Sequence, residues 1–96
     1  MEAWEKKLLR THYSFLLRSL DPETVRIALY SNDLLTWNEH EQIKAQTTPV
    51  SANERILEAL NRRAPGTLER FCRILEEEGG HSNVIEKLRS GKPIIC

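Results

Sequence analysis

The chain has 96 residues and a mass of 11.1 kDa, which is enough for one domain with one hydrophobic core. Hydrophobic residues make up 40% of it and charged residues 29%, a composition typical of a soluble globular domain and not of a disordered segment. Its 14 basic and 14 acidic residues cancel, which argues against a nucleic-acid-binding protein and against a protein that binds membrane surfaces through basic segments.

No apolar run approaches the roughly 20 residues that a membrane-spanning helix needs. The first residues also lack the basic-then-apolar order of a secretory signal peptide. The two cysteines, Cys72 and Cys96, are too few for a disulfide framework. We therefore expect a cytoplasmic protein that makes no contact with a membrane.

Glycine and proline divide the chain into segments whose apolar residues recur at helical spacing, which predicts an all-α domain. The first helix is expected over residues 2–19. Its apolar arc is broad, as in a helix that packs between several others. Leu17 falls among the polar residues of this helix, so either Leu17 is exposed or the helix is kinked.

The second and third helices are predicted from their N-terminal signals. Asp21 is the expected N-cap of the second helix, with Pro22 at its first position, and this helix should end near residues 32–33. Thr36 should begin the third helix, and Glu39 completes a capping box with it.

The fourth and fifth helices are expected in the second half of the chain. Residues 47–50 are predicted to form a loop, after which Ser51 and Glu54 form a second capping box. Thr67 is the expected N-cap of the fifth helix, which carries the clearest apolar stripe of the chain. The two glycines at residues 79–80 should stop this helix.

The sixth helix is expected around residues 84–88 and should end at Gly91. One domain is thus predicted over residues 1–91. Residues 92–96 have no helical pattern, and we expect a flexible tail there or the start of a linker.

No catalytic or metal-binding pattern is visible in the sequence. The three histidines and two cysteines lack metal-ligand spacing, and no glycine-rich phosphate loop is present. Serine, histidine and acidic residues occur, but no spacing groups them into a nucleophilic triad. His12 lies on the apolar side of the first helix and Cys72 in the stripe of the fifth, which favours structural roles for both. We therefore expect no enzymatic activity, no metal and no cofactor.

Charge is distributed unevenly along the chain. Residues 1–20 carry four basic and two acidic side chains, and residues 51–63 carry three basic and two acidic ones. Residues 21–46 carry five acidic and two basic side chains. The first and fourth helices are therefore basic, and the second and third are acidic. This pattern is either ordinary scatter on a solvated surface or the mark of a self-complementary module, whose basic patch meets the acidic patch of another copy.

Four stretches of the chain resemble the caspase-recruitment domain (CARD) family of the death-fold superfamily. Residues 34–43, LLTWNEHEQI, resemble the family's LLT-x-x-E-x-E-x-I pattern between the second and third helices. Residues 51–60 resemble its fourth helix, residues 65–75 its fifth and residues 84–88 its last. The resemblance covers about residues 4–90. It implies a six-helix antiparallel bundle with Greek-key topology and a kinked first helix.

The resemblance implies a function in homotypic CARD–CARD binding, which recruits or clusters initiator caspases or innate-immune signalling proteins, commonly through helical oligomers. In this family, a frequent contact joins a basic face of the first and fourth helices to an acidic face of the second and third. The basic residues that the resemblance selects are Lys6, Arg10, Arg18, Arg55 and Arg62. The acidic residues are Glu23, Asp33, Glu39 and Glu41.

Three neutral or aromatic positions bear on this contact. Thr11 and Tyr13 stand where basic-faced members of the family often carry more arginine, which predicts a weaker basic patch. Trp37, at the start of the third helix, is a candidate interface aromatic, because aromatic residues are enriched at interface centres. The alternative for Trp37 is packing against the end of the second helix.

Within the family, residues 43–48 and 65–75 look most like CARDs of apoptotic adaptors and initiator caspases. The expected partner is another CARD-containing protein of this kind, or a second copy of the chain in a helical oligomer. An innate-immune receptor or adaptor CARD is the alternative. A small helix-turn-helix domain that binds nucleic acid is an alternative of another class. The acidic second and third helices argue against it, since a recognition helix near phosphates should be basic.

Overall fold

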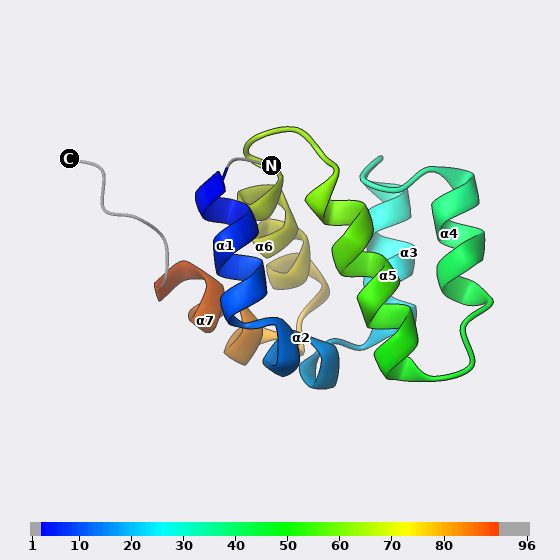
Figure 1. Ribbon diagram of the computed structural model, residues 1–96, viewed down its shortest axis with the longest axis horizontal. Coiled ribbons are helices and arrows are strands. Elements are labelled where there is room, and N and C mark those ends of the chain that lie inside the picture. The colour runs from blue at the N-terminus through cyan, green and yellow to red at the C-terminus, as the bar shows by residue number, and fades with distance from the viewer. Residues whose placement is uncertain (1–2, 91–96) are drawn as a thin grey trace.

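The computed structural model describes residues 3–90, and all regular structure in that range is α-helical (Figure 1). The helices are α1 (Ala3–Thr11), α2 (Tyr13–Ser19), α3 (Pro22–Ser31), α4 (Trp37–Lys44), α5 (Pro49–Asn61), α6 (Thr67–Glu78) and α7 (Ser82–Ser90). The all-α prediction is confirmed. Because α1 and α2 together occupy the predicted first helix, the seven helices of the described range are consistent with a six-helix death-fold bundle. The tail predicted at residues 92–96 lies outside the described residues.

The first predicted helix is kinked at His12. Its backbone there has φ −102° and ψ 18°, which is outside the helical region, and it separates α1 from α2. The kink keeps hydrogen bonds on both sides, since the His12 amide donates to the Leu8 carbonyl at 3.2 Å and the Leu16 amide donates to the His12 carbonyl at 2.9 Å. The change of direction leaves Leu16 fully buried and packs Leu17 partly against the core. Of the two expectations for Leu17, the kink is therefore the one confirmed.

Helix α5 is the central element of the bundle. It packs against α2, α3 and α4, while α6 packs against α3 and α7. Its inward side chains include Ile56 and Leu60, which are fully buried and belong to the same core cluster as Phe71 of α6. Each large aliphatic or aromatic side chain buried in this way contributes roughly 1.5–3 kcal/mol to folding. The predicted apolar stripe of α6 is also confirmed, with buried Leu68, Phe71, Cys72 and Leu75.

The N-terminus of α5 differs from the prediction. The helix begins at Pro49, not at Ser51, and Thr48 is its N-cap. The Thr48 hydroxyl Oγ1 accepts a hydrogen bond from the Ser51 amide at 3.1 Å, so the capping box predicted for Ser51 and Glu54 is wrong. Proline at the first helical position lacks only an N–H that would have no partner in the helix, which lets the helix start within the predicted loop.

The residues predicted to cap α3 and α4 occupy the N-cap positions of these helices. Thr36 Oγ1 accepts from the Glu39 amide at 3.2 Å, and Glu39 Oε1 accepts from the Thr36 amide at 2.9 Å, which completes the predicted capping box. Asp21 is the N-cap residue of α3 with Pro22 beside it. Its carboxylate accepts from the Thr24 hydroxyl at 2.8 Å instead of from a backbone amide. Local sequence signals therefore located both helix starts correctly.

The N-terminus of α6 is capped by a residue from a distant helix. Thr67, the predicted N-cap, is buried inside the helix and donates its hydroxyl to the Ala64 carbonyl at 2.7 Å, so that prediction is wrong. The N-cap position belongs to Gly66, whose φ of 90° is left-handed and favours glycine. Glu5 of α1 supplies the missing acceptor. Its carboxylate accepts from the Gly66 amide at 3.2 Å and from the Leu68 amide at 3.0 Å.

Glu5 is therefore a structural residue, with only 1% of its surface exposed. A carboxylate at a helix N-terminus is stabilised both by the orphan amides and by the helix dipole. The two hydrogen bonds tie α1 to α6 across the bundle, since Glu5 and Leu68 are 63 positions apart. The predicted C-terminal end of α6 is confirmed, because Gly79 follows Glu78 with φ 76°.

We predict that Glu5→Gln lowers the free energy of unfolding by about 1–3 kcal/mol, because the new amide nitrogen cannot accept a hydrogen bond from a buried N–H. Urea unfolding followed by circular dichroism measures the change. Glu86→Gln, at an exposed position of α7, is the matched control and should leave the stability within about 0.5 kcal/mol of the parent. Equal losses in the two variants would show that Glu5 does not cap α6.

Candidate functional site

The predicted basic residues fall on different sides of the helices that carry them. Lys6 and Arg10 of α1 line a groove between α1 and α5. Arg18 lies beyond the kink on α2, where its Nε donates to the Ser14 carbonyl at 3.3 Å, and it does not line this groove. Arg55 of α5 and Arg62, the residue that follows this helix, border a small crevice between α4 and α5. The residues of the expected basic face therefore lie in three separate places: in the groove, on α2 beyond the kink, and beside the crevice between α4 and α5.

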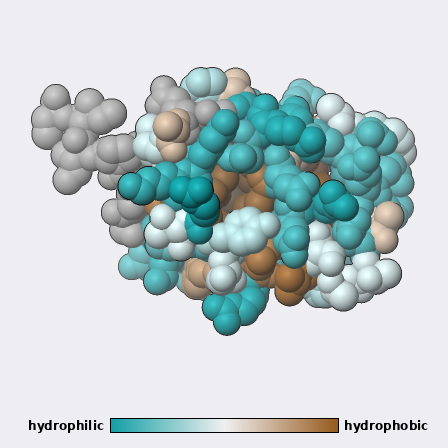
Figure 2. Space-filling model, in the orientation of Figure 1, coloured by the Kyte–Doolittle hydropathy of each residue, from teal (hydrophilic) through white to brown (hydrophobic). Residues whose placement is uncertain are grey.

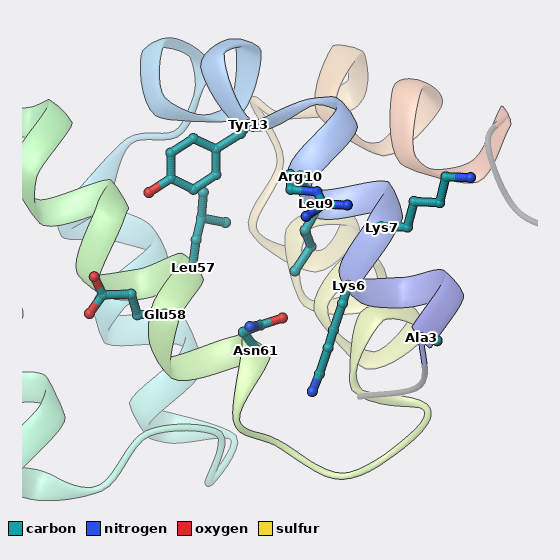
Figure 3. A pocket seen from close by; sticks show the side chains of 9 residues that line it. All are labelled: Ala3, Lys6, Lys7, Leu9, Arg10, Tyr13, Leu57, Glu58 and Asn61. Atoms are coloured by element: carbon teal, nitrogen blue, oxygen red, sulfur yellow. The ribbon is translucent and has the colours of Figure 1, made fainter.

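The groove between α1 and α5 has a volume of about 600 Å³. Figure 3 shows Lys6 and Asn61 extending into the space between the two helices, while Lys7 points to the other side of α1. The ring of Tyr13 reaches across toward Leu57 on α5. Figure 2, in the orientation of Figure 1, shows apolar residues exposed between the positions of these helices, with hydrophilic residues around them. The groove therefore has an apolar floor and a charged rim.

The basic side chains that line the groove all come from α1, and they are Lys6, Lys7 and Arg10. Among the ion pairs of residues 3–90, none involves Lys6 or Arg10. On α5, by contrast, Arg55 pairs with Glu58 at 3.4 Å and Arg62 pairs with Glu39 at 3.3 Å. Cations that already face a carboxylate contribute less to attracting an acidic partner. Lys6 and Arg10 are therefore the strongest basic candidates.

Glu39, predicted as part of the acidic face, is used inside the molecule. Its Oε1 completes the capping box, and its Oε2 accepts from Arg63 at 2.6 Å and from Arg62 at 3.3 Å. Only 12% of the side chain is exposed. The same carboxylate thus joins α4 to the C-terminal end of α5.

The other acidic candidates lie at opposite ends of the α3–α4 pair. Glu23, near the start of α3, lines a small cavity together with Lys44 at the end of α4. Asp33 is exposed in the turn between the two helices, with a left-handed φ of 61°. Glu41 lies one helical turn after Trp37, on the same side of α4. Glu41 therefore shares a face of α4 with Trp37, Asp33 lies in the turn that precedes this helix, and Glu23 lies at the other end of α3.

Trp37 is the most exposed large hydrophobic residue of the described range, at 60%. Its ring lies 5.8 Å from that of Tyr30 on α3 and is stacked 5.4 Å from that of His40, with an interplanar angle of 18°. Trp37 thus contacts the end of the second predicted helix through Tyr30 and still presents most of its ring to solvent. The three rings form one aromatic cluster at the junction of α3 and α4.

Sequence reasoning missed the residue that supports this cluster. Arg26 of α3 is buried, and its Nη1 lies 2.7 Å from His40 Nε2. Because arginine only donates hydrogen bonds, Nε2 must accept, which places the proton of a neutral His40 ring on Nδ1. The available signal was weak: Arg26 stands next to Val25 and one turn before Leu29, among the buried positions of α3. Nothing in the sequence paired it with His40 on another helix.

Tyr13 is the titratable group of the groove with an altered pKa. Burial against α5 raises the pKa of its hydroxyl above the usual 10.0, and the negative charges of Glu54 and Glu58 raise it further. All three causes oppose formation of the tyrosinate anion. The hydroxyl therefore stays protonated to higher pH than that of a free tyrosine.

Residues 3–90 contain no group of three or more His, Cys, Asp or Glu side chains placed to hold a metal ion. Within the same range, none of the helices has both the length and the apolar character needed to cross a membrane. Cys72 is a buried thiol in the core. What the described surface offers is two charged areas, a groove and an aromatic cluster.

Comparison with known protein families gives a match. The Caspase recruitment domain family model matches residues 6–91, which is nearly the whole chain. No curated protein and no solved structure matches the chain at a significant level.

We predict that tyrosinate formation at position 13 has a midpoint above pH 10.0, measured as the ultraviolet absorbance difference between the parent and Tyr13→Phe. Glu58→Gln should lower this midpoint by removing one of the opposing negative charges.

Because the folded-state pKa of Tyr13 is raised, Tyr13 contributes stability below the unfolded pKa, and this contribution is lost as the pH rises through the folded pKa. Tyr13→Phe should therefore unfold less readily than the parent at alkaline pH. A midpoint at or below 10.0 would mean that the ring does not lie against α5.

Proposed function

Because this chain belongs to the caspase recruitment domain (CARD) family, whose members are non-catalytic domains that bind other CARDs, we propose that it recruits or clusters initiator caspases or signalling adaptors in apoptosis. It does so in the cytoplasm, through a contact between the basic side of one CARD and the acidic side of the next. Lys6 and Arg10 of α1 are the principal basic residues of this contact. Asp33 and Glu41, at the α3–α4 end, are the principal acidic ones.

Opposite charges lie on separate surfaces of the chain, and this separation is the main support for the proposal. The cations of α1 line one side of α5, while α4 packs against α3 and the other side of α5 (Figure 1). Two different patches that complement one another form a head-to-tail contact, which leaves a free patch at each end and permits further addition. Charge complementarity of this kind speeds association and fixes register.

The remaining predicted residues have secondary places in the proposed contact. Arg62 and Glu39 neutralise one another within the chain, so they stabilise the fold that presents the contact. Arg55 is paired with Glu58 on the exposed side of α5. Arg18 lies away from the groove and Glu23 away from the aromatic cluster, so both belong to the periphery of the proposed contact.

We predict that Arg10→Glu weakens CARD–CARD association by about tenfold or more, because it removes an attractive charge and adds a repulsive one. Light scattering at low and then high salt measures the association, which should itself weaken with salt because exposed charges are screened. The matched control is Arg73→Glu on α6, which makes the same charge change at a side chain that is 74% exposed. Equal binding by these two variants would remove α1 from the contact.

On the acidic side, we predict that Asp33→Asn combined with Glu41→Gln weakens association while the free energy of unfolding changes by less than about 1 kcal/mol. Asparagine tolerates the left-handed backbone at position 33 as aspartate does, so the first change removes the charge alone. Glu39→Gln should instead lower the free energy of unfolding by about 1–2 kcal/mol, because it disturbs a capping box and two ion pairs. Urea unfolding and light scattering on the same samples separate the two effects. Intact binding by the double variant would place the acidic side elsewhere.

The choice between apoptotic and innate-immune partners is a matter of affinity. The likeness of residues 43–48 and 65–75 to apoptotic adaptors and initiator caspases favours the first. Titration of the chain against one CARD of each kind, with Arg10→Glu as the control for a specific contact, decides it. Tighter, Arg10-dependent binding to an innate-immune receptor CARD would assign the chain to that pathway instead.

A further inference from the structure

The apolar floor of the α1–α5 groove is not explained by charge pairing. Leu9, Leu57 and the ring of Tyr13 line it, beneath Lys6 and Arg10 at the rim. Its volume of about 600 Å³ is that of a site which holds a bulky group. Apolar surface in such a hollow is best covered by an apolar side chain whose neighbours carry negative charge.

The aromatic cluster has the complementary character. Of the four exposed large hydrophobic residues in the described range, three lie on α3 or α4, and they are Ile27, Tyr30 and Trp37. Trp37 is held in place before any partner arrives, because it is stacked on His40 and in edge contact with Tyr30. His40 is fixed in turn by Arg26. A tryptophan ordered in advance loses little freedom on binding, and tryptophan is over-represented among the residues that dominate interfaces.

We infer that Trp37 of one copy of this chain inserts into the α1–α5 groove of the next copy. Asp33 and Glu41 then lie beside the inserted ring, where they face Lys6 and Arg10 at the rim. This inference rests on the proposed charge-directed contact and adds to it an apolar centre. A buried aromatic centre surrounded by exposed ion pairs is the usual arrangement of a specific interface.

A second copy is the occupant that the charges select. Lys6 and Arg10 at the rim take part in none of the ion pairs of residues 3–90, and Glu58, which also lines the groove, is paired with Arg55. Glu41 shares the face of α4 that carries Trp37, and Asp33 lies in the turn before this helix, so the two surfaces carry opposite net charge and attract. They cannot meet within one chain, because α4 packs on the side of α5 away from α1 (Figure 1). Each copy carries one groove and one Trp37, so a copy that is bound through its groove can still insert its own Trp37 into another copy. The contact therefore extends into a linear oligomer. An aromatic side chain of this size buries roughly 150–250 Å², which gives the charged contact a substantial apolar contribution.

A pair of variants tests the insertion directly. Trp37→Ala removes the inserted ring and leaves the groove intact, whereas Asn61→Trp fills the groove from an exposed position and leaves the ring intact. Each variant alone should self-associate about 30-fold less tightly than the parent, as expected for loss of a dominant interface residue. An equimolar mixture should form a dimer of twice 11.1 kDa and nothing larger, since only one groove and one ring remain. Val50→Ala, another exposed hydrophobic, is the control and should associate like the parent.

Fluorescence reports on the ring itself. In a Trp4→Phe background, the emission comes from Trp37 alone. It should shift to shorter wavelength and become less accessible to a soluble quencher as the protein concentration rises at low salt, and high salt should reverse both changes. The same shift should appear in the mixture when the groove-filled partner carries a non-fluorescent analogue at position 61.

The outcomes separate this inference from the proposed function. Loss of association in Arg10→Glu with full association in Trp37→Ala would overturn the insertion and leave the charge-directed contact standing. If the parent protein stays monomeric at every protein and salt concentration, a second copy does not occupy the groove and the inference is overturned. Binding of the parent to another CARD would still support the proposed function in that case. Two variants that remain monomeric when mixed would also overturn the insertion. Unchanged association in Arg10→Glu would overturn the proposed contact as well.

Discussion

The fold depends on one buried carboxylate. Glu5 accepts hydrogen bonds from two amides at the N-terminus of α6 and so fixes how α1 lies on the bundle. A helix carries its side chains at about 100° per residue, so the direction of Glu5 sets the direction of the residues around it. With Glu5 turned inward, Lys6 and Arg10 line the groove toward α5. The orientation of the candidate binding surface is therefore a consequence of a structural hydrogen bond on another side of the same helix.

A second carboxylate shows how the chain divides its charges between stability and binding. Glu39 closes the N-terminus of α4 and also pairs with two arginines of the α5 end. The basic and acidic helices thus neutralise each other where they touch. In the proposed contact, the charge directed at a partner lies at the outer surfaces, on α1 at one side and on Asp33 and Glu41 at the other. Under that proposal, the arrangement attracts another copy or another CARD without opposing the packing of the monomer.

The kink at His12 decides which of the N-terminal residues can act together. A straight helix would have placed Lys6, Arg10, Ser14 and Arg18 along one side, as the sequence suggested. The change of direction after Thr11 moves Arg18 out of line and turns Leu16 into the core. It also lets the Tyr13 ring close one end of the groove, where burial and two glutamates raise its pKa. The kink that buries Leu16 in the core therefore also determines the shape of the α1–α5 groove.

The sequence by itself determined the features that act over one or two helical turns. The apolar stripe of α6, the Thr36–Glu39 capping box and the glycine stop at Gly79 all follow from spacings that the backbone geometry fixes. It located the charged helices but not the charges that remain free on them. The tertiary structure alone decided the Glu5 cap, the support of His40 by Arg26 and the pairing of Glu39, because these join residues from 14 to 63 positions apart. No local spacing encodes such contacts, since they form only when separate helices pack and buried polar groups must find partners.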